Sequence, residues 1–208
     1  MQSTLSATGA LRMRKTAARK APLSWRFKNA ARPSFIWGYI CYQLASLFTQ
    51  LTHIPTLVGC LSLRKKLLDG TWVDYGVVSY RSVTNAAVAF IVDDWDGGVT
   101  DISLWHFHGL GTGAAAENVT DTALGVECTT ALNPDSTRAV GTQTQPSANI
   151  IQSVGVLTFD ATAAVTEHGL FSAATAGTLY DRSVFGVVTM NAGESLSSSY
   201  SGTFNSGG

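Results

Sequence analysis

Four groups of side chains in this 208-residue sequence have types and spacings that could support chemistry. The first is His106 and His108, two apart on an expected strand, so both side chains would face one side. Two metal ligands can use that spacing. No third His, Cys or Asp follows at a diagnostic spacing. We therefore expect a pair of packed histidines, with a metal site as the alternative.

The second group is acidic. Residues 93–101 carry four carboxylates around a Gly-Gly turn, on Asp93, Asp94, Asp96 and Asp101. Calcium favours loops rich in oxygen ligands, but the EF-hand pattern with its closing Glu is absent. We expect a solvated acidic loop between two strands, and a bound metal ion is again the alternative.

The remaining two groups resemble enzyme motifs only loosely. Residues 109–114 fit G-x-G-x-x-A, but a dinucleotide site also needs a βαβ unit, which the β-rich context does not offer. Glu167 and His168 precede Ser172, yet neighbours on a strand point to opposite faces and cannot orient one another as a triad does. We expect no enzyme activity and no cofactor.

Charge is divided unevenly along the chain. Residues 1–70 hold eleven of the fourteen Lys and Arg residues and a single acid, Asp69. Residues 71–208 hold thirteen acids against three arginines, so a formal charge of +10 faces one of −10. Such asymmetry indicates two segments with different tasks. It suggests a component of an assembly before it suggests a catalyst.

Residues 1–33 are predicted to form an extended basic arm, with Pro22 and Pro33 as helix breakers. Its cations would dock on an acidic protein surface, or alternatively neutralise nucleic-acid phosphates without reading sequence. Interleaved aromatic residues would anchor the arm and the helix after it. The candidate partner-binding residues are Arg12, Arg14, Lys15, Arg19, Lys20, Trp25, Arg26, Phe27, Lys28, Arg32, Phe35, Trp37 and Tyr39.

Residues 34–70 are predicted to be helical. Ser34 would cap a helix over 35–53, and the run LSLRKKLL at 61–68 would form a short second one. No charged residue occurs between Arg32 and Arg64, but polar residues three to four apart line one stripe of the first helix. We therefore expect an amphipathic helix packed on protein, and no membrane span.

Residues 71–208 are predicted to be a β domain. Short β-branched and aromatic runs alternate with turn residues at the spacing of a sandwich or barrel. The fold class is thus mainly β, an antiparallel β-sandwich of jelly-roll type preceded by the arm and one or two helices. The expected strands are 72–80, 86–92, 102–108, 139–143, 150–159, 164–170, 183–190 and 197–204.

Several segments of the β domain resemble one family of tailed-bacteriophage structural proteins. The most distinctive are TEHGLFSA at 166–173 and DRSVF at 181–185, supported by TDTALG at 120–125 and RAVGTQ at 138–143. The resemblance covers about residues 72–208 and brings no catalytic residues with it. It implies a virion protein, and three cysteines without a CxxC motif agree with synthesis in the reducing host cytoplasm.

The leading hypothesis from this resemblance is a capsid cement, or decoration, protein. It would form a homotrimer and bridge subunits of the major capsid protein. A tail, fibre or connector component is one alternative. A glycan-binding β-sandwich module is another, with Trp95 and Trp105 exposed in a concave site.

Overall fold

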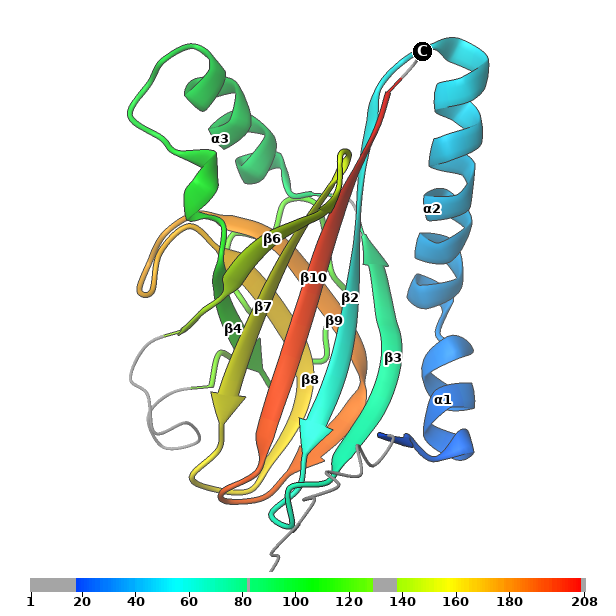
Figure 1. Ribbon diagram of the computed structural model, residues 1–208, viewed down its shortest axis with the longest axis vertical. Helices are drawn as coiled ribbons and strands as arrows, with labels where there is room; N and C mark the ends of the chain where they lie inside the picture. Colours follow the sequence, from blue (N-terminus) through cyan, green and yellow to red (C-terminus); the bar gives the residue numbers. More distant parts are fainter. Residues whose placement is uncertain (1–17, 82, 129–137, 207–208) are drawn as a thin grey trace, which may run out of the picture.

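The computed structural model describes residues 18–81, 83–128 and 138–206. Within these ranges the chain is mainly β, with ten strands in two sheets, three α-helices and one short 3-10 turn. Figure 1 shows the two sheets facing each other, with two helices along one flank and the third helix at one end.

The larger sheet contains six strands. Its centre is antiparallel and long, with the pairing of β2 and β10 running from Thr56 opposite Asn205 to Lys66 opposite Ser195. A short parallel strand closes one edge. In spatial order the strands are β1 (Arg19–Lys20), β3 (Trp72–Arg81), β2 (Thr56–Lys66), β10 (Ser195–Asn205), β7 (Ile150–Thr158) and β6 (Thr142–Ser147).

The smaller sheet is antiparallel and has the order β5 (Ala139–Val140), β4 (Phe107–Gly111), β8 (Ala163–Phe171) and β9 (Leu179–Met190). The two sheets share one core, because strands with one buried face must cover it with another layer. The inward residues include Leu61, Leu157 and Leu196 from the larger sheet and Leu110, Val165 and Val188 from the smaller, none more than 3% exposed. Burying each such side chain stabilises the fold by about 1.5–3 kcal/mol.

The helices are α1 (Leu23–Ala30), α2 (Pro33–Thr52) and α3 (Asn85–Trp95). Pro33 suits the first position of α2, where its missing N–H costs nothing, and His53 ends the helix in the left-handed conformation. Gly38 lets the helix approach β3 closely, since a Cβ there would lie 2.3 Å from the carbonyl oxygen of Tyr80. None of the helices in the described ranges has the length and apolarity that a membrane crossing requires.

The structure confirms the helix predicted at 35–53, but its N-cap is Arg32 and not Ser34, which lies inside the first turn. The structure corrects the second helix, predicted at 61–68. Residues 61–66 of that segment belong to β2, where Leu61 and Leu63 are buried while Ser62 and Arg64 are not, a period of two. The basic cluster at its end is also part of the strand. Lys65 is 8% exposed, and its ammonium lies 2.6 Å from the Glu194 carboxylate.

Two expected strands are wrong and one is divided. Residues 86–92 belong to α3, which Thr84 caps by accepting a hydrogen bond from the N–H of Ala87. Of 102–108 only the last two residues enter β4, since Ile102–Leu104 forms the 3-10 turn η1. The strand expected at 139–143 splits at Gly141 into β5 and β6, which belong to different sheets. The other five strands are confirmed.

The structure describes only part of the predicted extended arm, and part of what it describes is helical. Residues 1–17 lie outside the described residues. Arg19 and Lys20 do extend alongside β3, but Leu23–Ala30 is helical. Pro22, read as a breaker, instead stands at the N-cap of α1, where proline is tolerated because the first helical N–H groups lack partners anyway.

Candidate functional site

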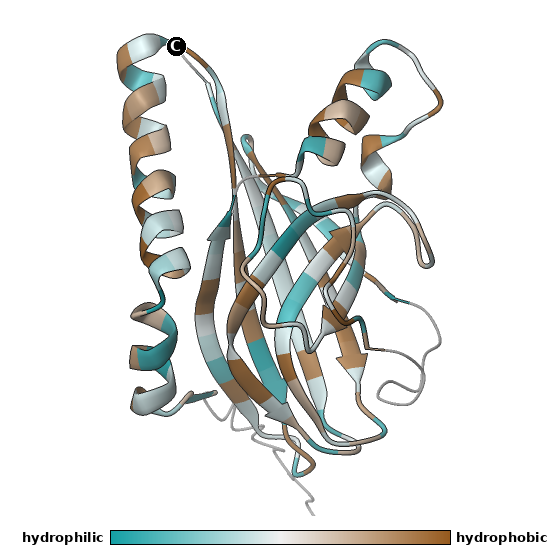
Figure 2. Ribbon diagram, turned by 180° about the vertical axis from the view of Figure 1, so that it is seen from behind, coloured by the Kyte–Doolittle hydropathy of each residue, from teal (hydrophilic) through white to brown (hydrophobic). Residues whose placement is uncertain are grey.

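The outer side of α2 is the least usual surface of the molecule. The helix carries no charged residue, and only Gly38 and Thr49 are buried on its inner side. Together with α1 it exposes a row of large apolar side chains, here called the apolar flank, and Figure 2 shows hydrophobic segments along the whole of α2. The flank consists of Leu23, Phe27, Ile36, Trp37, Ile40, Leu44, Leu47, Phe48 and Leu51, each at least 39% exposed.

This exposure has a physical implication. A helix that is apolar around most of its circumference is normally covered on more than one side. Soluble monomers rarely leave so large a contiguous apolar surface open, and such surfaces mark contacts with other proteins. The apolar flank is therefore the candidate functional site.

The inner side of α2 is fixed to the sheet by aromatic contacts. Phe35, Tyr39 and Tyr42 all pack on the ring of Tyr80 in β3, with ring centroids 5.0–5.5 Å apart. In α1 the indole N–H of Trp25 donates to the carbonyl oxygen of Val187 at 2.6 Å. These contacts hold the flank in one orientation relative to the β body.

The predicted partner-binding residues thus fall into three groups. Arg12, Arg14 and Lys15 lie outside the described residues. Trp25, Arg32 and Phe35 are half-buried and turn toward the chain's own β body. The exposed remainder comprises Arg19, Lys20, Arg26, Phe27, Lys28, Trp37 and Tyr39, of which Lys20 pairs with Asp74. Sequence reasoning missed the second half of α2, although its uncharged apolar run was the available signal.

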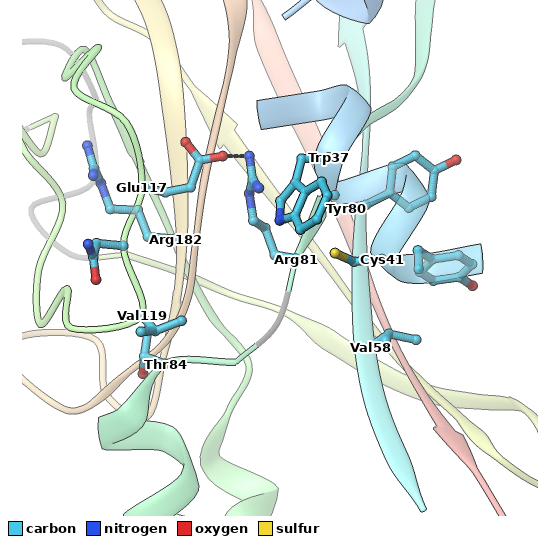
Figure 3. A pocket seen from close by; sticks show the side chains of 12 residues that line it. Trp37, Cys41, Val58, Tyr80, Arg81, Thr84, Glu117, Val119 and Arg182 are labelled. Atoms are coloured by element: carbon cyan, nitrogen blue, oxygen red, sulfur yellow. Dashed lines mark ion pairs between the residues drawn. The ribbon is translucent and has the colours of Figure 1, made fainter. Parts of the chain in front are cut away.

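A pocket of about 200 Å³ separates α2 from the β body (Figure 3). Trp37 and Cys41 line it from the helix, and Arg81 and Glu117 line it from the body. The Arg81 guanidinium forms an ion pair with Glu117 and also donates to the carbonyl oxygen of Ser34 at 3.3 Å. Arg81 therefore ties the start of α2 to the loop that carries Glu117.

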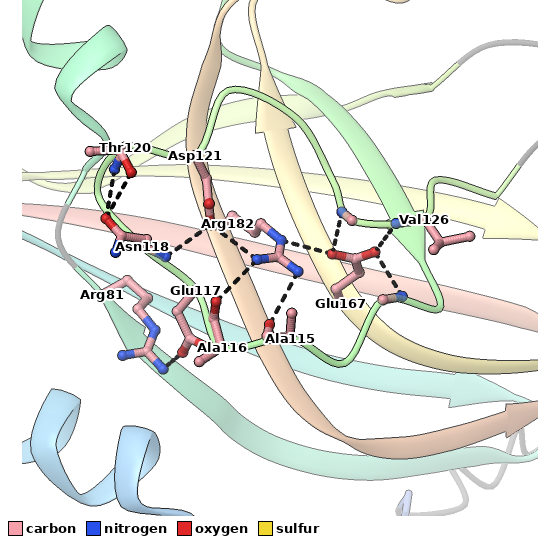
Figure 4. Close-up of polar contacts among 12 residues, drawn as sticks. Arg81, Ala115, Ala116, Glu117, Asn118, Thr120, Asp121, Val126, Glu167 and Arg182 are labelled. Carbon is pink, nitrogen blue, oxygen red and sulfur yellow. Dashed lines mark hydrogen bonds and ion pairs between the residues drawn. The ribbon is translucent and has the colours of Figure 1, made fainter.

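That loop, residues 112–127, is organised around one buried carboxylate (Figure 4). Glu167 has no exposed surface and accepts hydrogen bonds from the backbone N–H groups of Gly113, Gly125 and Val126 at 2.8–3.0 Å. The Nε of Arg182 donates to it at 2.8 Å. Burial raises the pKa of Glu167, but these donors outweigh that effect and bring the pKa below its ordinary value.

Arg182 extends the same network. Its guanidinium lies 3.0 Å from the Asp121 carboxylate and reaches the carbonyl oxygens of Ala115 and Ala116. The two most distinctive segments of the resemblance, at 166–173 and 181–185, thus meet in one ion pair between Glu167 and Arg182. The side chains of Glu167 and Arg182 hold the loop in place. Nothing in the sequence indicated that these two residues form a pair.

The glycine-rich run at 109–114 is explained by the same carboxylate. A Cβ on Gly113 would lie 2.4 Å from the Glu167 carboxylate, so only glycine permits this approach. The run continues from β4 into the loop without a following helix, which removes the dinucleotide interpretation. The N–H of Gly113 in this run donates to a carboxylate of the chain itself.

The two histidines of the predicted pair do not face the same side. His106 precedes β4, and its Nδ1 lies 2.8 Å from the carbonyl oxygen of Ser103. His108 points into the core, where its Nδ1 lies 2.9 Å from Nε2 of His168 and its Nε2 lies 2.9 Å from Oγ of Ser153. Burial lowers the pKa of His108 to about 3, so the ring is neutral. Within the described ranges no group of three or more potential metal ligands assembles.

Glu167 and His168 point to opposite sides of β8, as the strand geometry predicts: one contacts the outer loop and the other contacts His108. The acidic segment at 93–101 begins in the last turn of α3 and ends just before η1, so its expected place between strands is wrong. Asp93 accepts hydrogen bonds there from the N–H and hydroxyl of Thr100.

Trp95 is 79% exposed while Trp105 is 5% exposed, so the two do not form one open platform.

Asp181 is a buried carboxylate whose two oxygens differ. Oδ1 accepts a hydrogen bond from Ser183 at 2.8 Å, whereas Oδ2 has no hydrogen-bond partner among the described residues. Burial raises the pKa of Asp181 to about 7, although Ser183 and Arg81 oppose the rise. The unfolded chain releases this proton near pH 4. Its contribution to stability therefore falls as pH rises from about 4 to about 7 and is constant above that.

Asp181→Asn should remove this dependence. We expect the variant's gain in unfolding free energy over the parent to be about 2–3 kcal/mol larger at pH 8 than at pH 5. Urea unfolding at both pH values measures it, with Asp96→Asn at an exposed position as the matched control. Equal gains at the two pH values would contradict the burial of an ionisable Asp181.

Comparison with known proteins gives no match: no family model fits the sequence, and no curated protein is significantly similar to it.

Proposed function

We propose that this protein is a structural component of a tailed-bacteriophage virion, made in the host cytoplasm, and that it acts as a capsid cement or decoration protein. The apolar flank is the observation that carries the proposal. A row of exposed aromatic and aliphatic side chains, on a helix that is fixed to the β body, is typical of a surface that contacts another protein. In the proposal it binds the major capsid protein and bridges its subunits.

The rest of the chain supports such a role. The β body, which we take as a jelly-roll type sandwich, is a compact support braced by buried ion pairs such as Glu167 with Arg182 and Lys65 with Glu194. The cations at positions 12–32 would complement an acidic shell and guide the encounter. A homotrimer would present three flanks at once, so that avidity adds to the affinity of each.

The proposal predicts a copy number. Quantitative mass spectrometry of purified virions should find this chain in amounts comparable to the major capsid protein, because a cement repeats with the lattice it covers. A number in the tens would instead assign it to the tail, fibre or connector. Absence from purified particles would overturn the virion assignment altogether.

A further inference from the structure

A second cavity is lined by residues of η1 and of the strands β6, β7 and β10. Its volume is about 330 Å³. Most of its wall is apolar and aromatic, and none of the described residues that line it is charged. Trp105, Tyr180 and Tyr200 form its aromatic side, with ring centroids of Trp105 and Tyr180 4.2 Å apart, and Ile151 and Leu170 form its aliphatic side.

Two buried donors on this wall have no partner. Trp105 is 5% exposed and Tyr200 is 2% exposed, and neither the indole Nε1 nor the phenol oxygen has a hydrogen-bond partner among the described residues. A buried polar group left unpaired costs about 1–3 kcal/mol. Neither atom is itself exposed to the cavity, so a ligand oxygen would satisfy these donors only if the side chains of the wall shift.

The third polar group of the wall is the hydroxyl of Ser153, which a buried histidine holds in place. Ser153 is 3% exposed, and its Oγ lies 2.9 Å from Nε2 of His108, which is in turn fixed by His168. A hydroxyl has one donor and two acceptor positions, so the contact with His108 leaves capacity for another hydrogen bond. The wall therefore combines an apolar surface with the preoriented hydroxyl of Ser153, and small-molecule sites usually have such a composition.

We propose that this cavity binds a small neutral ligand, about two fused rings in size, that carries a single hydroxyl or carbonyl oxygen. The size follows from volume, since an engineered cavity of about 150 Å³ binds one benzene ring and this one is roughly twice as large. The ligand is neutral because the wall holds no countercharge, while the buried carboxylate of Asp181 acts on both Tyr180 and Tyr200. A sugar fits poorly, because most of its hydroxyls would face apolar side chains.

This inference does not depend on the apolar flank or on a virion setting. It is tested by isothermal titration calorimetry of the full chain with 2-naphthol, with naphthalene as the ligand that lacks the oxygen and methyl glucoside as the polar ligand. We expect saturable one-to-one binding of 2-naphthol, at least fivefold weaker binding of naphthalene, and no heat from methyl glucoside.

Two variants on β7 locate the site. Ile151 is 40% exposed at the cavity, so Ile151→Trp should fill it and weaken 2-naphthol binding at least tenfold. Val156 is 48% exposed on the other face of the strand, and Val156→Trp should leave binding unchanged. Thermal unfolding verifies that both variants fold.

Three results would overturn the proposal. They are no saturation by 2-naphthol, equal binding by Ile151→Trp and the parent, or binding of methyl glucoside in preference to 2-naphthol. Equal affinities for naphthalene and 2-naphthol would overturn the assignment of an oxygen to the ligand. If no small molecule binds and Ile151→Trp instead blocks attachment to a protein partner, the cavity belongs to a protein side chain and the proposal fails.

Discussion

Replacing Glu167 by Gln is expected to lower the free energy of unfolding by about 3–5 kcal/mol at pH 7. The change keeps the shape of the side chain but leaves the buried guanidinium of Arg182, 4% exposed, without its closest carboxylate. Three backbone N–H groups of the loop would also lose a charged acceptor. Equilibrium unfolding in guanidinium chloride measures the loss.

An exposed ion pair provides the control. Lys20 pairs with Asp74, but its side chain is 67% exposed, so Lys20→Gln should cost no more than about 1 kcal/mol. Similar losses for the two variants, or a loss under about 1 kcal/mol for Glu167→Gln, would show that the network does not brace the loop.

The difference between Glu167→Gln and the parent should also depend on pH. Because the pKa of Glu167 is lower in the folded than in the unfolded chain, the stabilisation is complete above its unfolded value of about 4.3. It is lost as pH falls through the folded pKa. The two proteins should therefore approach each other in stability only in acid.

The double substitution Leu44→Gln and Leu51→Gln is expected to reduce incorporation into virions at least tenfold. These side chains are 52% and 72% exposed, so the fold loses little by the change. An apolar contact buried at an interface contributes on the order of 1–2 kcal/mol, and 1.4 kcal/mol is a factor of ten in affinity. Incorporation is measured by mass spectrometry of purified particles, relative to the major capsid protein.

The control makes the same kind of substitution, an exposed apolar residue to Gln, at positions outside the apolar flank. Val92 and Val99 are 57% and 102% exposed outside the flank, so Val92→Gln with Val99→Gln should incorporate normally. Unfolding free energies of both double variants should stay close to that of the parent, as is usual for exposed positions. Equal incorporation of the two would exclude the apolar flank as the contact surface.

Local patterns predicted much of this fold. Alternation with period two at 150–159 and 197–204 identified β7 and β10. An uncharged and largely apolar run, with Pro33 before it and His53 at its end, identified α2. Where an apolar run fits both the period of a strand and the period of a helix, the sequence alone does not decide between the two structures. Residues 86–92 are almost entirely apolar, and the hydroxyl of Thr84, two residues earlier, makes them a helix.

The features that organise the site depend on partners distant in sequence. Glu167 meets Arg182 across a β-hairpin and Gly113 from a loop 54 residues away. From the sequence, Lys65 is predicted to lie in a basic helical turn. Its ion pair with Glu194 appears only in the fold, because the two residues are far apart in the sequence. Which face of α2 stays open likewise depends on Tyr80, whose ring covers the other face.

The lack of charge between Arg32 and Arg64 also determines how the flank can be observed chemically. Reagents that couple amines or carboxylates have no target along α2, and trypsin finds no cleavage site within it, so conventional cross-linking would not register this surface. Cys41 is exposed on the helix and provides the exception. Its thiol offers a site for labelling at the border between the flank and the pocket, on a helix that carries no amine or carboxylate side chain.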